Sequence, residues 1–535
     1  MKYSKIILFL ALAALCACGN KRELNTKVSN TTGWNYNDKR SFNFQASEGR
    51  SVAPIGMVPI EGGTFTIGET DEFITAPRNN AHRSITVSSF YMDKYEITNL
   101  NWQEYVNWTQ SVFGAVAPEL VEKAKPNPLV WQDDMAYNEP LIQNYFESTM
   151  FSFYPVVGVT WEQAMRYCQW RTDRVNELLL IQAGLLTFPD FASLGPIYDE
   201  AAKDAWEAAE GYWMDPVEVK SEENGGELVN MYRPSYEYIR DKFVFNTEKY
   251  FLVDTYNPTV GRKPLYNTYG EERKANRADG MLVIDYRLPT EAEWEFAAYA
   301  PVAGEDGLTI EGKIYPWSGY HPRDLGIAST SKGLMQANFV RARGDMMGVS
   351  GALNDAYVTT APVDAFAPND FGLYNMAGNV NEWVMDVYRE TTNQEFTEYN
   401  SFRGNMFTQP VVEDGHILLD SLGCVLHQLV KNGDKRTVRD GDMSSQINTL
   451  YPLDPKTSKL PQERIKHDPT DILTPQITAN TRVYKGGSWN DRIYWLNPST
   501  RRYLEQDQCS NTIGFRCAMS ALGDQITPEL MFKKK

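Results

Sequence analysis

The stretch of sequence that decides the fold is rich in Asn, Gly and carboxylate and carries large apolar residues: Pro368-Asn369-Asp370-Phe371-Gly372-Leu373-Tyr374-Asn375-Met376-Ala377-Gly378-Asn379-Val380-Asn381-Glu382-Trp383. A solvated loop would not need so many large apolar groups, and a regular helix or strand would not readily tolerate Gly372 and Gly378. The mixture indicates a loop folded into the core, with turns forced by glycine. Buried loop backbone must find partners for its N–H and C=O groups.

A hard cation is one way to supply those partners. Asn375 and Glu382 offer side-chain oxygens, and Gly378 and Val380 offer carbonyl oxygens, all within eight residues. Such a set of oxygens suits calcium, although its spacing is not that of an EF-hand. The alternative is an Asn-rich turn that satisfies its own hydrogen bonds, and the spacing leaves both interpretations open.

The composition is that of an acidic globular protein. The chain has 535 residues, of which 42% are apolar and 13% aromatic, and its formal net charge is −17. This composition excludes a disordered chain and allows a large core. The acidic balance argues against nucleic acid and anionic lipid head groups as partners, because both repel a negative surface.

The N-terminus carries a targeting signal. Lys2 and Lys5 precede an apolar run over residues 6–15 that is too short to span a membrane. The run ends in Leu15-Cys16-Ala17-Cys18, which resembles a bacterial lipobox. An ordinary signal peptide with incidental cysteines is the alternative.

The lipobox implies a defined order of segments at the start of the chain. We expect residues 1–17 to be removed, Cys18 to carry the lipid, and residues 18–50 to act as a tether. Gly19 stands where Asp would retain a lipoprotein in the inner membrane, so known sorting signals favour the outer membrane. We therefore expect a lipid-anchored protein of the outer membrane that faces the periplasm.

The remaining cysteines and the histidines give no zinc or histidine-based metal site. The cysteines left after processing are Cys168, Cys424, Cys509 and Cys517, and no pair has zinc-ligand spacing. The five histidines are scattered along the chain and form no motif. An oxidising compartment would allow disulfides among these cysteines.

Local patterns predict short strands and capped helices. Residues 57–68 fit two short strands about a Gly-Gly turn, and residues 84–92 fit another strand. Thr98 or Asn99 can cap a helix whose apolar residues recur at helical spacing as far as Phe113.

Two capping boxes predict further helices, which begin after Thr160 and Thr290. The carboxylates of Glu291 and Glu293 could suggest general acid–base chemistry. The favoured interpretation is structural, because Glu291 lies in the first turn and Glu293 closes the capping box.

Seven short motifs, taken in order, resemble those of the formylglycine-generating enzyme (sulfatase-modifying factor) family over nearly the whole mature chain. They are Gly62-Gly63, Phe90-Tyr91-Met92-Asp93 with Glu96-Ile97-Thr98-Asn99, Pro155-Val156-Val157-Gly158-Val159-Thr160-Trp161, Arg287-Leu288-Pro289-Thr290-Glu291-Ala292-Glu293-Trp294-Glu295, Asn375–Trp383, Gly486-Gly487-Ser488-Trp489 and Gly514-Phe515-Arg516. Each motif is weak alone, but the common order is specific. The resemblance implies a single α+β body with little regular secondary structure, a variant of the C-type lectin fold.

The resemblance also implies two structural calcium sites. One is the opening loop, with the side chains of Asn375 and Glu382 and the carbonyls of Gly378 and Val380. The other consists of the side chains of Asn338 and Asp355 and the backbone carbonyls of Phe339 and Tyr357. The family further links its equivalents of Cys168 and Cys517 in a disulfide, which would close a long loop and add about 4–5 kcal/mol of stability.

The catalytic residues of the family have no counterpart here. The family's oxidases bind copper through two cysteines that follow the Gly-Gly-Ser-aromatic motif, and the matching positions are about Asp491 and Leu496. A thiolate binds Cu(I) tightly, whereas Asp and Leu do not. We therefore expect a non-catalytic member without copper. The alternative is an enzyme or ligand-binding protein that uses the family groove with non-thiol chemistry.

Two insertions interrupt the family pattern, within a domain expected to span residues 51–522 before a tail at 523–535. They cover about residues 178–280 and 388–480. Their large side chains either pack on the body or dock other subunits. These side chains are Trp206, Tyr212, Trp213, Tyr232, Tyr236, Tyr238, Phe243, Phe245, Tyr250, Phe251 and Tyr256 in the first insertion and Tyr399, Phe402, Phe407, Leu418, Leu419, Leu422, Val425 and Leu426 in the second.

Two short runs indicate a narrower group of relatives. Residues 32–38 and 89–93 resemble gliding-motility lipoproteins of Bacteroidetes, a group with members in the type IX secretion machinery. The resemblance implies other subunits of that machinery as partners, a membrane attachment through Cys18, and no nucleic acid.

Overall fold

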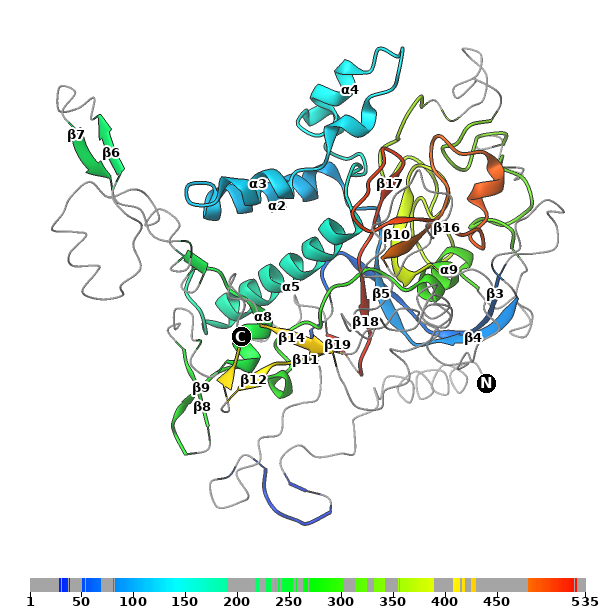
Figure 1. Ribbon diagram of the computed structural model, residues 1–535. Helices are drawn as coiled ribbons and strands as arrows, with labels where there is room; N and C mark the ends of the chain where they lie inside the picture. The colour runs from blue at the N-terminus through cyan, green and yellow to red at the C-terminus, as the bar shows by residue number, and fades with distance from the viewer. Residues whose placement is uncertain are drawn as a thin grey trace, which may run out of the picture.

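The computed structural model describes the larger part of residues 51–189, 243–301, 313–324, 332–341, 355–388 and 480–526, with shorter pieces around residues 28–38, 217–240 and 408–429. Short strands and a few helices alternate with long turns in these residues (Figure 1). The expected α+β body with little regular secondary structure is therefore confirmed. Within the described ranges, no helix is long and apolar enough to cross a membrane.

The helices differ widely in length. They are α2 (Asn99–Phe113), α3 (Pro118–Ala124), α4 (Glu139–Asn144), α5 (Trp161–Ala183), α8 (Thr247–Leu252) and α9 (Glu291–Tyr299), with 3-10 turns η1 (Pro128–Trp131), η2 (Thr149–Phe151), η4 (Arg277–Asp279) and η5 (Ile493–Leu496).

The strands are short and come in small sheets. They are β1 (Ser51–Val52), β2 (Met57–Ile60), β3 (Gly63–Ile67), β4 (Arg83–Val87), β5 (Phe90–Asp93), β6 (Val217–Lys220), β7 (Leu228–Met231), β8 (Leu265–Tyr266), β9 (Glu272–Arg273), β10 (Asn381–Val387), β11 (Thr408–Pro410), β12 (Val412–Glu413), β13 (His416–Ile417), β14 (His427–Leu429), β15 (Thr481–Lys485), β16 (Arg502–Glu505), β17 (Ile513–Gly514), β18 (Ala518–Ser520) and β19 (Gln525–Ile526).

Two sheets organise the body. The four-stranded sheet has the order β16-β15-β10-β17, and β10 runs antiparallel to β15 and parallel to β17. The three-stranded sheet has the order β18-β5-β2, with antiparallel neighbours. Figure 1 shows β5, early in the chain, beside β18, near its end. Residues from opposite ends of the sequence therefore share one sheet.

Strand β10 separates two apolar cores, because successive side chains of a strand point to opposite faces. Trp383 packs in the core that contains Trp102, Tyr167 and Phe515. Its neighbour Val384 packs in the core that contains Phe90, Trp294 and Tyr388. The strand that follows residues 368–380 is thus buried on both faces, and its polar residues Asn381, Glu382 and Asp386 are buried as well.

The prediction of a hairpin about Gly62-Gly63 is wrong in its pairing. Strands β2 and β3 flank the two glycines as expected, but β2 pairs with β5 and β3 pairs with β4. A Cβ atom on Gly62 would lie 2.3 Å from the carbonyl oxygen of Val87, so only glycine allows this close crossing. The strand expected over residues 84–92 is correspondingly divided into β4 and β5, which join different sheets.

The helix predictions are confirmed at their N-termini. Thr98 caps α2, and Thr160 and Thr290 form capping boxes with Gln163 and Glu293 at the starts of α5 and α9. Each box satisfies backbone N–H groups that the helix itself cannot pair. The choice of a structural role for Glu293 is therefore correct, and its carboxylate also pairs with Arg287.

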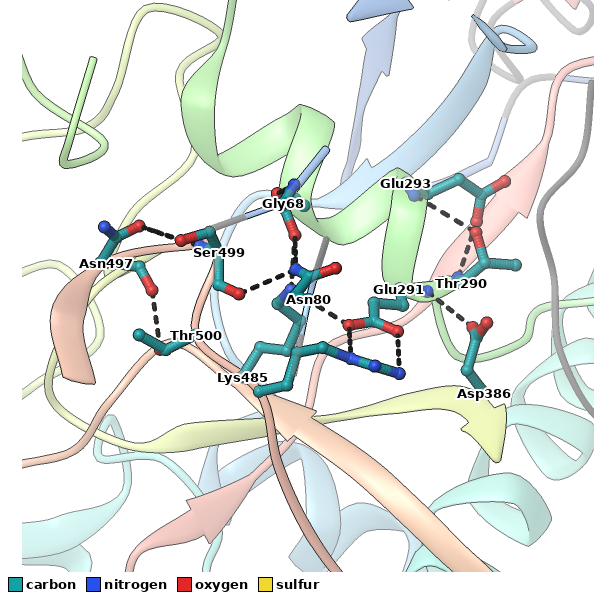
Figure 2. A network of polar contacts seen from close by, with 12 residues as sticks. Gly68, Asn80, Thr290, Glu291, Glu293, Asp386, Lys485, Asn497, Ser499 and Thr500 are labelled. Atoms are coloured by element: carbon teal, nitrogen blue, oxygen red, sulfur yellow. Dashed lines mark hydrogen bonds and ion pairs between the residues drawn. The ribbon is translucent and has the colours of Figure 1, made fainter. Parts of the chain in front are cut away.

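Glu291 does more than complement the dipole of α9, because it lies in a buried network of charges (Figure 2). Its carboxylate accepts hydrogen bonds from Arg501 at 2.6 and 2.9 Å and lies 3.3 Å from the Lys485 ammonium. Lys485 in turn pairs with Glu295 at 2.6 Å. Burial would raise the pKa of Glu291, but the charges of Arg501 and Lys485 outweigh it and lower the pKa to about 2.

The described aromatic residues of the first insertion pack on the body. Phe245, Tyr250 and Tyr256 are buried against the end of α5, and Phe251 packs against the same cluster. Tyr236 and Phe243 pack in a second cluster with Phe113 of α2. For these residues the structure favours the packing interpretation over docking.

The expected insertions can be located against the described elements. Residue 178 lies inside α5, and residues 388–480 fall between β10 and β15. In the second insertion Val425 is buried, Leu418 is partly buried and Leu426 is exposed. Several residues assigned to these insertions or to the N-terminus lie outside the described part of the chain, namely Cys18, Trp206, Tyr212, Trp213, Tyr232, Tyr238, Tyr399, Phe402, Phe407, Leu419, Leu422 and Cys424.

The cysteines expected to form a disulfide lie side by side in the core. The Sγ atoms of Cys168, on α5, and Cys517, before β18, are 3.6 Å apart, and both residues are buried as thiols. Burial, followed by the hydrogen bond with Cys168, raises the pKa of the Cys517 thiol. The positions suit oxidation with a small movement, and the disulfide stays a prediction.

The buried network gives a first testable prediction. Replacing Glu291 with Gln would leave Arg501 without its buried carboxylate, and we expect a loss of about 3–5 kcal/mol in the free energy of unfolding. Urea denaturation followed by tryptophan fluorescence measures this loss. The effect should be full above pH 4.5, the ordinary value for Glu, and should shrink as the pH falls toward about 2, where the native carboxylate takes up its proton.

The matched control is Glu122→Gln, which removes an exposed carboxylate paired with Lys125. Exposed pairs contribute only about 0–1 kcal/mol, so this variant should unfold almost as the wild type does. Equal losses for the two variants, or a loss for Glu291→Gln that does not change with pH, would refute the prediction.

Candidate functional site

The loop over residues 368–383 is folded into the core as predicted. Its turns use left-handed backbone at Asn375 (φ 51°) and Asn379 (φ 62°) as well as at Gly372 and Gly378. Asn tolerates this conformation better than other residues with a Cβ atom. At Gly378 a Cβ atom would lie 2.5 Å from the carbonyl oxygen of Asn338, so a glycine is required there.

The amides of this loop converge on a buried carboxyl group. The Nδ2 atoms of Asn375 and Asn379 both donate to Glu96, at 3.0 and 2.9 Å. Asn379 also accepts a hydrogen bond from the backbone of Ala361 at 2.7 Å. The loop therefore satisfies part of its polar groups through Glu96 and Ala361, which lie outside it, and these contacts differ from a turn that bonds only to itself.

A second buried carboxylate, Glu382, lies beside this cluster. It accepts two hydrogen bonds from Arg516, at 2.7 and 2.5 Å, and one from the Trp294 indole at 2.8 Å. Burial, followed by the negative charge of Glu382, raises the pKa of Glu96 to about 8. Arg516 thus faces two buried carboxyl groups, and a further cation here would relieve their repulsion.

These contacts test how the first calcium set fits. Asn375, Gly378 and Val380 lie in the turns before β10 and Glu382 lies in β10 itself, and all four are buried. The carboxylate of Glu382 is already bound by Arg516 and Trp294, so a cation would have to share it. The Asn375 amide and the two backbone carbonyls remain the natural oxygen donors of this set.

The second calcium set has a clearer signature. Asp355 is buried, its Oδ1 atom lies 3.5 Å from the Tyr357 backbone nitrogen, and its Oδ2 atom has no hydrogen-bond partner among the described residues. Burial raises the pKa of Asp355 to about 6, against the opposing hydrogen bonds from the backbone of Tyr357 and Phe339. An unpartnered buried carboxylate oxygen is costly, and a calcium ion would satisfy it.

The structure brings the two sets next to each other. The backbone nitrogen of Asn379 donates to the carbonyl oxygen of Asn338 at 3.0 Å. Asn338 also donates from its side chain to the Thr359 carbonyl at 2.8 Å, which fixes its orientation. Each set combines a single carboxylate with amide and carbonyl oxygens, and no cluster of three His, Cys, Asp or Glu residues occurs among the described residues.

The positions that correspond to the family's thiols are both used structurally. Asp491 pairs with Arg502 at 2.7 and 2.6 Å and accepts a hydrogen bond from Ser488 at 2.6 Å. Burial opposes ionisation, but Arg502 and Ser488 hold the pKa of Asp491 below its usual range. Leu496 is fully buried in an apolar cluster that includes Phe339. Neither side chain resembles a copper ligand.

Sequence reasoning did not foresee the hydrogen-bonding roles of Glu96, Asn379 and Arg516. All three lie inside motifs that it identified, but periodicity and spacing say nothing about which distant charges meet. The usable signal was the presence of charged residues inside otherwise apolar motifs, since such charges are buried only when they are paired.

Comparison with known proteins bears on this arrangement. A family model described as the sulfatase-modifying factor enzyme 1-like domain matches residues 43–521. The formylglycine-generating enzyme of Bos taurus is 24% identical over 377 residues, 70% of each chain. The inactive C-alpha-formylglycine-generating enzyme 2 of Bos taurus is 38% identical over 105 residues, which are 19% of this chain and 27% of that one.

Solved structures are similar at lower identity. PvdO from Pseudomonas aeruginosa matches 89% of this chain and 100% of its own, at 14% identity and a TM-score of 0.36. Treponema denticola variable protein 1 matches 87% of this chain and 95% of its own, at 16% identity and a TM-score of 0.34. Because the family model spans most of the sequence, the chain belongs to the formylglycine-generating enzyme (sulfatase-modifying factor) family.

Proposed function

We propose that this family member has no oxidase activity and serves as a structural lipoprotein. The observation that supports this proposal is the replacement of the thiol pair by Asp491, in an ion pair with Arg502, and Leu496, in an apolar cluster. The similar proteins include one whose name declares it inactive, so loss of activity has a parallel within the family.

The narrower assignment is to the outer membrane, in the gliding-motility and type IX secretion apparatus. It rests on the lipobox that ends at Cys18 and on the short runs that resemble the lipoprotein GldJ of Bacteroidetes. Its partners would be subunits of that apparatus, including relatives of GldK (PorK). An acidic chain with a lipid anchor needs no basic patch to reach the membrane.

Calcium would have a structural role in this protein. The unpartnered oxygen of Asp355 supports one ion, and the crowded carboxyl groups of Glu96 and Glu382 support a second beside Asn375. Each ion would fix a long turn to the four-stranded sheet, because the ligands precede or enter β10. No catalytic step follows from such ions.

The first test of this proposal is chemical. Purified protein supplied with copper should leave the cysteine of a sulfatase peptide unchanged, because the chain has no cysteine between Ser488 and Gln508 to bind the metal. Mass spectrometry of the peptide detects the aldehyde, and the bovine enzyme serves as the positive control. Conversion above the copper-only background would overturn the assignment.

A second test concerns the anchor. In the native host, the wild-type chain should incorporate a labelled palmitate analogue and sediment with the outer membrane, and Cys18→Ser should abolish both. Cys16→Ser is the matched control and should behave as the wild type. Affinity purification of the anchored protein should recover other subunits of the apparatus. An unlabelled wild-type chain, or one recovered alone, contradicts the narrower assignment.

A third test concerns calcium. Chelation should lower the melting temperature, since a ligand held about a hundredfold above its Kd stabilises the native state by about 2.7 kcal/mol. Asp355→Asn should remove part of this response, whereas the exposed neighbour Asp364→Asn should keep all of it. An unchanged melting curve in chelator, together with no bound metal by elemental analysis, would end the proposal.

A further inference from the structure

A lobe formed by residues 126–154 stands out from the sheets. It contains η1, α4 and η2, and Figure 1 shows α4 at the edge of the molecule, away from β10 and its neighbours. We call this segment the acidic lobe. It lies outside both insertions and outside the calcium sets, so the proposed function assigns it no role.

The inner side of the acidic lobe is firmly attached to the body. The Trp131 ring stacks on Trp489 with centroids 5.9 Å apart, and the Tyr145 hydroxyl donates to the Pro155 carbonyl at 2.6 Å. The Asn99 side chain donates to two carbonyls of the lobe, at 3.1 and 3.0 Å. These contacts hold the backbone of the lobe in one position relative to the body.

The outer side carries large apolar side chains that contact water. Their exposed fractions are 59% for Leu129, 107% for Met135, 83% for Tyr137, 74% for Met150 and 65% for Phe153. Single exposed apolar residues are ordinary, but five within one short lobe are not. Met135 in addition holds left-handed backbone (φ 64°), which residues with a Cβ atom rarely adopt.

The charge of the acidic lobe has one sign. From Pro126 to Met165 the chain contains no Lys, Arg or His. The exposed residues Asp133, Asp134, Glu139 and Glu147 alternate with the exposed apolar residues along the chain. An apolar surface with an acidic rim is complementary to a basic segment that carries apolar anchors.

We infer that the acidic lobe is a docking surface for a basic, amphipathic segment of another protein. Met and aromatic side chains supply an adaptable apolar contact, and the carboxylates set orientation and association rate. The charge disfavours an anionic lipid surface, and it disfavours a second copy of this chain, whose net charge is −17. The inference does not require the lipid anchor or the loss of oxidase activity.

The test uses the purified full chain and a synthetic peptide of Lys and Leu in amphipathic order, with a companion in which Ser replaces Leu. The first peptide should bind with an affinity that falls as salt rises, and the companion should bind about tenfold more weakly or not at all. Fluorescence anisotropy of labelled peptide gives both Kd values. Equal affinity of the two peptides would mean bulk charge attraction only and would overturn the inference.

Two sets of substitutions locate the binding surface, and each has a matched control. Met135→Ser with Tyr137→Ser, Met150→Ser and Phe153→Ser should weaken binding about tenfold. The apolar control replaces four large residues elsewhere that are also more than half exposed with Ser, namely Phe188, Tyr266, Tyr269 and Leu522. The charge set is Asp133→Asn, Asp134→Asn, Glu139→Gln and Glu147→Gln, and its control neutralises the exposed Glu61, Glu104, Glu413 and Asp507. A control that weakens binding as much as its lobe set would overturn the inference.

A photo-crosslinking measurement keeps the inference testable if the multiple variants fail to fold. A benzophenone amino acid replaces Met135, whose side chain is fully exposed, in the otherwise unchanged chain expressed in its native host. The same group at Phe188 is the control position. The expected adduct from position 135 maps to a basic segment of another protein. Adducts only with lipid, with a second copy or with an acidic segment, or no adduct at all, would overturn the inference.

Discussion

The ion pair between Arg516 and Glu382 is the interaction on which the body depends. Both side chains are buried, so each would be prohibitively costly without the other. Arg516 also donates to the carbonyls of Asp93 and Tyr374, at 3.2 and 2.8 Å. One guanidinium thereby joins the end of β5, the central loop and the start of β10, three segments that have little regular secondary structure to hold them.

A fold with short strands depends more on such ion pairs and hydrogen bonds between segments than on long series of backbone hydrogen bonds within a sheet. The network of Glu291, Lys485, Glu295 and Arg501 connects α9 to β15 and to the chain before β16 in the same way. Ion pairs of this kind give little net stability over apolar packing, but breaking one partner leaves a buried charge. The structure therefore gains a specific arrangement of turns, and its tolerance to change at these residues is low.

Features that depend on residues close in sequence could be predicted, whereas contacts between residues far apart in the sequence could not. The capping boxes at Thr160 and Thr290 could be identified because capping depends on residues three positions apart. The pairing of β2 and β3 could not, because a Gly-Gly turn fits either a hairpin or a crossing between sheets. In the candidate site, the buried loop and its oxygen donors were predicted, whereas the convergence of Asn375 and Asn379 on Glu96 depends on contacts across the chain.

The pairing of β18 with β5 has a consequence for how the chain acquires its structure. Phe515 and Cys517 complete one core, and Arg516 neutralises the Glu382 carboxylate that the Trp294 indole of the other core contacts, so both cores lack a buried partner until this segment has been synthesised. Until then β5 lacks its partner β18 and β10 lacks its partner β17. Both pairings join residues that are far apart in the sequence, and such contacts form slowly. A chain that terminates before this segment would therefore lack the β18 strand of the three-stranded sheet and the cation that pairs with Glu382.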